Sequence, residues 1–344
     1  MKSKFFIFIF KHKLRRRTLN NLLKIKKIKN FYIINLSGYL NYLLLGLPLI
    51  FLINIFKEKF KNFTLISCDG LPQIKYNGIN LWFGGTSYKV PKEFKNFKNN
   101  CHFFENFSKK EENLLNLYPY KPQNLKSSDD QKIIFIGGFY ILKDEIVEKI
   151  WKNEKEKLLE KLTLIDEVSF WKKYELDNNE RLQFYYLQLK ERLRFEMITQ
   201  LKKIFLEKFI LVGSKWKKYI SDAKEDEFDL FKIRNFYNGN ICIDFGSKWG
   251  SNILYPRSIE IIEHGGLLIQ SQQQDSSKEF YDLNIINKFN SLDELTTKLQ
   301  NLLVNKELFK KQFKKQFEFF NNPELNYATF EKMYEISKKN NSII

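Results

Sequence analysis

The residues best suited to chemistry lie in the segment 240–270, NICIDFGSKWGSNILYPRSIEIIEHGGLLIQ. Its pattern predicts a buried strand over 241–245, a loop of small residues over 246–252, a helix, and a second buried strand over 267–270. The unpaired N–H groups of a glycine-containing loop and of a helix N-terminus point at one place, where they bind anions. The segment therefore predicts an anion site, with a β-α-β unit that binds no ligand as the alternative.

The predicted helix carries signals at both ends. Pro256 suits its first turn, where the missing N–H leaves no partner unsatisfied. Gly265 and Gly266 are expected to end the helix with a left-handed residue. We expect Glu260 and Glu263 to lie early in the helix, where the dipole favours acidic side chains.

Length and composition set the class of protein. The 344 residues predict about two domains, and a hydrophobic content of 43% with 16% aromatic residues excludes a disordered chain. The formal net charge of +18 gives a surface that attracts phosphates of nucleotides, nucleic acid or anionic lipids. Lys, Asn, Ile and Phe are all frequent, which indicates a compositional bias and weakens any argument from charge alone.

The cysteines and histidines indicate neither disulfides nor a metal. Cys68, Cys101 and Cys242 are widely spaced and lie in or beside apolar runs, so we interpret them as reduced core residues of a cytoplasmic protein. The three histidines show no metal-ligand spacing.

The N-terminal sequence leaves two alternatives open. Residues 1–30 carry eleven Lys or Arg and no acid, and the segment 14–29 suits either a basic helix on a membrane surface or a solvated helix. The uncharged segment 39–56 is at the lower edge of a membrane-spanning length. Its Asn, Gly and Pro residues favour a buried or membrane-dipping helix over a membrane span.

Apolar runs alternate with helical patterns on both sides of a polar segment, 118–131, which is the predicted domain boundary. Strands are predicted at 5–10, 31–36, 64–68, 81–84, 101–105, 132–136, 209–212, 241–245, 267–270 and 284–289. Helices are predicted within 143–208, which is rich in charge and has an aromatic side, and at 291–304, 306–320 and 327–339. This alternation predicts two α/β domains with parallel sheets, whose ligands bind at the carboxyl ends of strands or between the domains.

Three features of the C-terminal half resemble a known family. They are Arg257-Ser258-Ile259-Glu260 followed by Gly265, the run ILVGSKW at 210–216, and the run FNSLDEL at 289–295. Over about 132–339 the chain resembles the nucleotide-binding domain of GT-B glycosyltransferases, in particular the group-1 type related to spore-maturation-like transferases. The resemblance implies two Rossmann-like domains facing a cleft: an acceptor domain over 1–125, a nucleotide-sugar domain over 132–325 with a helical insertion, and a C-terminal helix over 326–344 that packs back on the first.

The resemblance also implies roles for individual residues. Glu260 matches the acid that accepts hydrogen bonds from the ribose hydroxyls, and Arg257 would face the diphosphate, where its fork fits two oxygens. Further donor-binding candidates supply hydroxyl, amide, cationic or close-packing groups: Ser251, Asn252, Lys215, Lys248, Gly137, Gly138 and Gly213. Such enzymes hold the diphosphate with a helix dipole and cations, so no metal or other cofactor is expected.

The sequence departs from the family at Asn252, where many retaining members carry a second glutamate. Retention or inversion of the anomeric configuration therefore stays undetermined. An inverting mechanism would need a base from the N-terminal domain, for which Asp69, His102 and Glu105 are candidates at predicted strand ends.

These observations predict a hexosyltransferase-like enzyme that moves a sugar from a nucleotide-sugar to a glycan or lipid-linked acceptor in cell-envelope or surface polysaccharide synthesis. We expect it in the cytoplasm, with its basic N-terminus drawing it to the anionic inner face of the membrane. The alternatives are a basic nucleic-acid-binding protein and a membrane-associated non-enzymatic protein. The sequence contains no helix-turn-helix, RRM or zinc signature that would support the first alternative, so no nucleic-acid partner is expected.

Overall fold

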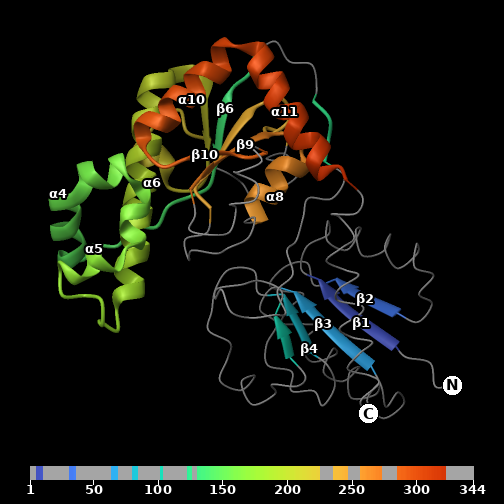
Figure 1. Ribbon diagram of the computed structural model, residues 1–344, viewed down its shortest axis with the longest axis horizontal. Helices are drawn as coiled ribbons and strands as arrows, with labels where there is room; N and C mark the ends of the chain where they lie inside the picture. The colour runs from blue at the N-terminus through green and yellow to red at the C-terminus, as the bar shows by residue number, and fades with distance from the viewer. Residues whose placement is uncertain are drawn as a thin grey trace. The chain divides into compact units, whose positions relative to one another are not determined.

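The computed structural model describes residues 122–125, 130–224, 235–246, 256–272 and 285–322, together with the backbone of five strands between residues 5 and 103. The chain divides into two compact units, residues 1–120 with 322–344, and residues 121–321 (Figure 1). The helices predicted over 14–29, 39–56 and 327–339 lie outside the described residues.

The described strands of the first unit form one parallel sheet. They are β1 (Phe5–Phe10), β2 (Phe31–Asn35), β3 (Phe63–Cys68), β4 (Asn80–Phe83) and β5 (Cys101–Phe103). Their order across the sheet is β2-β1-β3-β4-β5, and every neighbouring pair is parallel. Each strand begins within one residue of a run that the sequence predicts as a strand.

The second unit contains a parallel sheet with the same order of strands. It consists of β6 (Ile133–Ile136), β7 (Phe209–Val212), β8 (Ile241–Asp244), β9 (Leu267–Ser271) and β10 (Asn287–Phe289). The order is β10-β9-β8-β6-β7, so the chain leaves β6 first toward one edge and later returns to its other side. Such a reversal opens a crevice at the carboxyl ends of the two strands involved, here β6 and β8.

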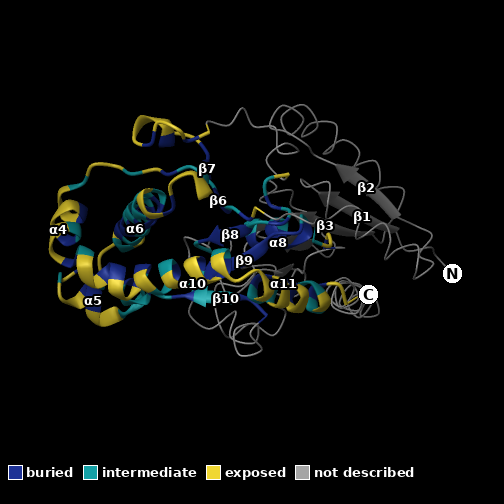
Figure 2. Ribbon diagram, turned by 90° about the horizontal axis from the view of Figure 1, so that it is seen from above, coloured by how far each residue is buried: buried dark blue, intermediate teal, exposed yellow. Residues whose placement is uncertain are grey.

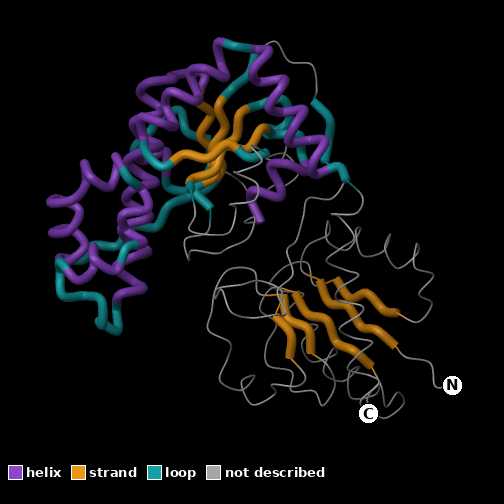
Figure 3. Tube along the Cα trace, in the orientation of Figure 1, coloured by secondary structure: helices purple, strands orange, loops and turns teal. Residues whose placement is uncertain are grey.

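The core of this unit explains why its strands are continuous apolar runs. Ile133, Phe135, Ile241 and Leu267 are fully buried, as is usual for a parallel sheet covered by helices on both faces (Figures 2 and 3). Cys242 lies among them as a free, buried thiol, and burial raises its pKa well above the ordinary value. The prediction of a reduced core cysteine is therefore confirmed at this position.

A helical insertion connects β6 to β7, as predicted. It comprises α4 (Glu145–Glu160), the 3-10 turn η1 (Leu162–Asp166), α5 (Val168–Lys172) and α6 (Leu182–Phe205), and the turn η2 (Leu206–Lys208) leads into β7. Asp144 caps α4 by accepting hydrogen bonds from the Ile146 and Val147 amides. The insertion projects away from the sheet and has an aromatic interior of its own, in which Phe170 and Trp171 are buried (Figure 1).

Two helices complete the second unit after β10. They are α10 (Leu292–Val304) and α11 (Lys306–Phe320), and a short turn, η3 (Trp216–Lys218), follows β7. The Ser291 hydroxyl accepts a hydrogen bond of 3.0 Å from the Glu294 amide, which confirms the predicted N-terminal cap of α10. None of the helices in the described ranges is both long and apolar enough to cross a bilayer.

Helix α8 (Pro256–Glu263) follows β8, and its bounds agree with the sequence prediction. It begins at Pro256, and Gly265 follows its end with a φ of +75°, both as predicted. The expected position of Glu263 is wrong, because the helix has only two turns and Glu263 is its last residue. Glu260 lies mid-helix rather than in the first turn, so neither acid is placed to serve the N-terminal end of the dipole.

Candidate functional site

The site begins at the carboxyl end of β6, where Gly137 and Gly138 leave the sheet. The Gly137 amide donates to the Val212 carbonyl (2.8 Å), and the Trp216 indole N–H donates to the Gly137 carbonyl (2.6 Å). On the other side, Arg194 of α6 donates to the Gly138 carbonyl (2.7 Å). The glycine pair is thus held in place by the end of β7 and by the helical insertion.

Gly213, at the end of β7, packs directly on this pair. A Cβ at Gly213 would lie 2.6 Å from both the carbonyl carbon and the oxygen of Gly137, and the φ of Gly213 is +147°. Both the close approach and the backbone conformation require glycine. Three of the predicted site residues, Gly137, Gly138 and Gly213, therefore lie together.

Replacing Gly213 with alanine is expected to lower the free energy of unfolding by about 2–4 kcal/mol, since a rare backbone conformation and an overlap with main-chain atoms add up. Chemical denaturation monitored by tryptophan fluorescence would measure the change. The neighbouring substitution Ser214→Ala is the control, because Ser214 is exposed and should change stability little. Equal stability of the two variants would contradict the close packing of Gly213 on Gly137.

Arg257, in the first turn of α8, reaches the same place from β8. A Cβ at Gly137 would lie 2.9 Å from Arg257 Nη1 and 3.2 Å from its Cζ, so the guanidinium rests against the bare face of Gly137. Glu260 follows three residues later, which puts it on the same side of the helix as Arg257. The cation and the acid thus share one side of α8 beside the crevice between β6 and β8.

The charges of Arg257 and Glu260 both affect the pKa of the buried Tyr237 phenol. Its pKa is raised by burial in the first place, while the Arg257 charge lowers it and the Glu260 charge raises it further. The buried phenol therefore places Arg257 and Glu260 in one electrostatic environment.

A buried polar network fixes the first turn of α8 to the sheet. The Ser258 hydroxyl donates to Asp244 Oδ2 (2.5 Å), the Gln270 amide donates to the Ser258 oxygen (2.9 Å), and the Gly246 amide donates to Asp244 Oδ1 (3.1 Å). Asp244 and Ser258 are 0% exposed and Gln270 is 1% exposed. Because Ser258 is next to Arg257, this network fixes the backbone from which the Arg257 side chain extends. The sequence analysis missed it, although an acid that closes an apolar strand (ICID) is a signal that could have revealed it.

The remaining predicted residues are placed only in part. Lys215 follows β7 with a left-handed backbone, and its ammonium lies 4.3 Å from the centroid of the Tyr140 ring. His102 lies in β5, where its backbone pairs with Leu81. Five further candidates lie outside the described residues: Asp69, Glu105, Lys248, Ser251 and Asn252.

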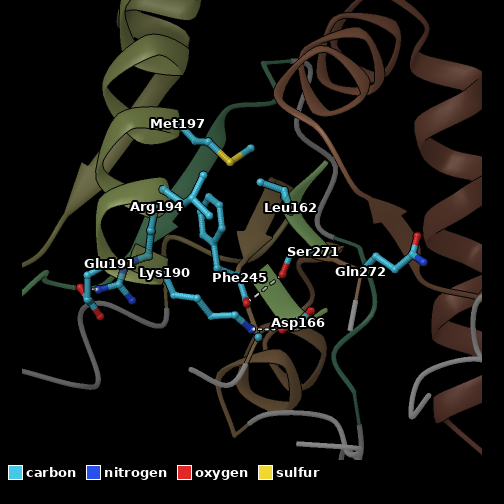
Figure 4. A pocket seen from close by; sticks show the side chains of 11 residues that line it. Leu162, Asp166, Lys190, Glu191, Arg194, Met197, Phe245, Ser271 and Gln272 are labelled. Atoms are coloured by element: carbon cyan, nitrogen blue, oxygen red, sulfur yellow. Dashed lines mark hydrogen bonds and ion pairs between the residues drawn. The ribbon is translucent and has the colours of Figure 1, made fainter. Parts of the chain in front are cut away.

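A cavity lies beside this site, between the insertion and the carboxyl ends of β8 and β9 (Figure 4). It is lined by Leu162, Asp166, Lys190, Glu191, Leu193, Arg194, Met197, Phe245, Gly246, Ser271 and Gln272. Nothing in the sequence analysis indicated it, because its walls come from four segments far apart in the chain.

Two ion pairs form the charged part of the cavity wall, to which Ser271 and Gln272 add uncharged polar groups. Arg194 donates to Glu191, whose Oε2 also accepts from the Tyr140 amide (3.0 Å). Lys190 Nζ lies 3.5 Å from Asp166 Oδ1, which accepts a hydrogen bond of 2.6 Å from the Tyr186 hydroxyl. Burial lowers the pKa of the Lys190 ammonium, and the Asp166 carboxylate opposes that shift. Burial and the same carboxylate both raise the pKa of Tyr186.

Among the described residues, no group of three or more His, Cys, Asp or Glu side chains is arranged to hold a metal ion. The polar side chains beside the crevice are instead an arginine and a glutamate, because the Gly137 N–H and the carbonyls of Gly137 and Gly138 are hydrogen-bonded within the protein. Such groups can bind an anion and hydroxyl groups by hydrogen bonding and charge.

The fold is that of an α/β protein with two parallel sheets of the same strand order, and in the second unit the order reverses between β6 and β8. No family model matches the chain. No curated protein sequence matches it either.

Several solved structures are similar to the whole chain at low sequence identity. WaaG, a glycosyltransferase involved in lipopolysaccharide biosynthesis, is 11% identical with a TM-score of 0.44, over 96% of this chain and 99% of its own. A glycosyltransferase from Rickettsia africae is 14% identical with a TM-score of 0.45, over 99% and 98%. TarM is 10% identical with a TM-score of 0.46, over 83% of this chain and 57% of its own. At these identities and TM-scores the likenesses assign no activity to this chain, so its function is argued from its own residues.

Proposed function

We propose that the protein is a glycosyltransferase that moves a sugar from a nucleotide-sugar donor to a glycan or lipid-linked acceptor. The observation that carries the proposal is the contact of the Arg257 guanidinium with Gly137 at the crevice between β6 and β8. An arginine fork held at the carboxyl ends of parallel strands is suited to the oxygens of a diphosphate. The motif Arg257-Ser258-Ile259-Glu260 that resembles the GT-B family supplies both the arginine and the acid.

In this proposal each part of the site binds one part of the donor. The diphosphate lies against Arg257 and the N-terminal end of α8, and the ribose hydroxyls donate to the Glu260 carboxylate. Ser251, Asn252 and Lys215 add donors to the phosphates, and Gly138 and Gly213 allow the close approach of the chain. No metal is needed, because the arginine and the helix dipole stabilise the negative charge of the leaving diphosphate.

The acceptor side of the proposal rests on the resemblance alone. Residues 1–125 are proposed to bind the acceptor, and Asp69 or His102 to accept the proton of its hydroxyl if the enzyme inverts. We further propose a cytoplasmic enzyme of cell-envelope or surface polysaccharide synthesis, with a peripheral contact to anionic membrane.

A thermal-shift panel tests the proposal directly. UDP-, GDP-, ADP- and CMP-linked sugars are added to the full-length protein at rising concentration. A ligand present at about 100 times its dissociation constant should stabilise the protein by roughly 2.7 kcal/mol, because it binds only the folded state. Failure of every nucleotide-sugar to raise the melting temperature would contradict the proposal. Salt-sensitive binding to arbitrary DNA in its place would favour the nucleic-acid-binding alternative.

A further inference from the structure

We propose that the cavity between the insertion and the ends of β8 and β9 binds the hydroxyl groups of the donor's sugar ring, with Asp166 and Lys190 as the residues that select the sugar. This inference rests on the proposed function, since it assigns a place to one part of the nucleotide-sugar. It adds two residues from the helical insertion to the binding site.

Asp166 and Lys190 retain hydrogen-bonding capacity that a ligand can use. Both hydrogen-bonding contacts of the Asp166 carboxylate are made by Oδ1, to Tyr186 and to Lys190, and within the described part of the chain Oδ2 makes none. The Lys190 ammonium has three donors, and it lies 3.5 Å from Asp166 Oδ1 and 4.6 Å from the centroid of the Tyr186 ring. Their side chains are 13% and 19% exposed, so they reach a cavity and not open solvent. The Asp166 carboxylate and the Lys190 ammonium thus place an acceptor and a donor side by side in a mostly buried wall.

The charge balance of the cavity selects a neutral ligand. Its wall holds two acids, Asp166 and Glu191, and two bases, Lys190 and Arg194. A charged ligand of either sign would compete with one member of a buried pair and leave the other without compensation, which costs several kcal/mol. A hydroxyl group avoids this, because it donates to a carboxylate and accepts from an ammonium at the same time.

The shape and the apolar part of the wall agree with a sugar. Leu162, Met197 and Phe245 supply apolar surface beside the ion pairs (Figure 4). The cavity volume of about 50 Å³ has room for a few water-sized groups, which matches the hydroxyl groups along one edge of a ring. The rest of the ring would lie at the cavity mouth, near Gly246.

The cavity wall and the proposed diphosphate position contact two adjacent residues. Arg257 rests on Gly137, and Arg194 of the cavity wall donates to the carbonyl of Gly138. Because the sugar is bonded to the diphosphate in the donor, its pocket must adjoin the diphosphate site. The glycine pair provides that adjacency within one unit of the chain.

The test distinguishes the affinity contributed by the sugar from that contributed by the nucleotide. Calorimetry measures the affinities for UDP and UDP-glucose, GDP and GDP-mannose, and ADP and ADP-glucose, with wild type and with the double variant Asp166→Asn/Lys190→Gln. The double variant removes both charges together and so leaves no unpaired one. It should bind the preferred nucleotide-sugar about ten- to a hundredfold more weakly than wild type, the range expected for hydrogen bonds to charged groups. Its affinity for the matching free nucleoside diphosphate should stay within about twofold.

The matched control neutralises an ion pair on the same segment but outside the cavity. Lys161→Gln/Glu167→Gln removes a contact of 2.6 Å between exposed side chains and should change neither affinity. An equal loss of affinity for the free nucleotide and the nucleotide-sugar in the cavity variant would overturn the inference while leaving the proposed function intact, and so would full retention of the sugar's contribution. Absence of nucleotide binding by the wild type would refute the proposed function itself.

Discussion

Substitution of Arg257 by methionine is expected to weaken nucleoside diphosphate binding at least about a hundredfold. The guanidinium is held against Gly137, and its neighbour Ser258 is anchored in the buried network with Asp244. Two charge-assisted hydrogen bonds to phosphate oxygens, at about 1.5–3 kcal/mol each, account for a loss of this size. Arg257→Lys should recover only part of the affinity, because an ammonium keeps the charge but loses the planar fork. Calorimetric titration with UDP, GDP and ADP measures the effect.

A control and a companion variant make the result specific. Arg181→Met removes an arginine that pairs with Asp144 on the insertion, and we expect unchanged binding. Glu260→Gln should weaken binding of the ribonucleotide about tenfold or more, yet leave its 2′,3′-dideoxy analogue almost unaffected, because that analogue has no ribose hydroxyls to donate. Equal losses for both nucleotides would contradict the ribose role of Glu260, and wild-type affinity of Arg257→Met would contradict the placement of the diphosphate.

Substitution of Arg194 by methionine is expected to have the largest effect on stability, lowering the free energy of unfolding by about 3–5 kcal/mol. The side chains of Arg194 and Glu191 are 9% and 3% exposed, so loss of the arginine leaves a buried carboxylate without its cation. The Gly138 carbonyl loses its donor in the same step. For a unit of this size, differential scanning calorimetry should show a melting temperature lower by roughly 6–20 °C.

A double variant distinguishes the buried charge from a simple loss of packing. In Arg194→Met/Glu191→Gln both charges of this pair are removed, and the glutamine oxygen can still accept from the Tyr140 amide. This variant should therefore be more stable than Arg194→Met alone, even though it carries one more substitution. If it is less stable, the ion pair is not the source of the effect. Lys314→Met is the surface control, since its contact with Glu318 at 3.7 Å is exposed.

Local signals in the sequence were sufficient for most individual elements. Apolar runs identified β6, β7, β8 and β9, because strands buried on both faces have few polar side chains, whereas the edge strand β10 contains Asn287 and Lys288. The Ser291 cap, the proline at the start of α8 and the left-handed Gly265 are likewise determined by a few adjacent residues. The same signals contain the position of Glu263, because a helix that begins at Pro256 and ends before Gly265 has Glu263 in its last turn.

The sequence also contained the residues of the candidate site but not their arrangement. Arg257 and Glu260 are separated by one turn of a helix, which a local pattern can detect. The contact of Arg257 with Gly137 joins residues 120 positions apart, and it exists only because β8 pairs with β6 and not with β7. A strand order of this kind is decided by the packing of whole elements, to which no single motif corresponds.

What the sequence determined by itself is thus the strands of both sheets, the helices of the second unit, the basic character of the chain and a helix that carries an arginine and a glutamate. The tertiary structure alone decided that this arginine meets the glycine pair, that Asp244, Ser258 and Gln270 lock its helix to the sheet, and that a cavity with two ion pairs lies alongside. The physical reason is distance along the chain. Hydrogen bonding and side-chain periodicity act over a few residues, whereas these contacts form only when the sheet brings remote segments together.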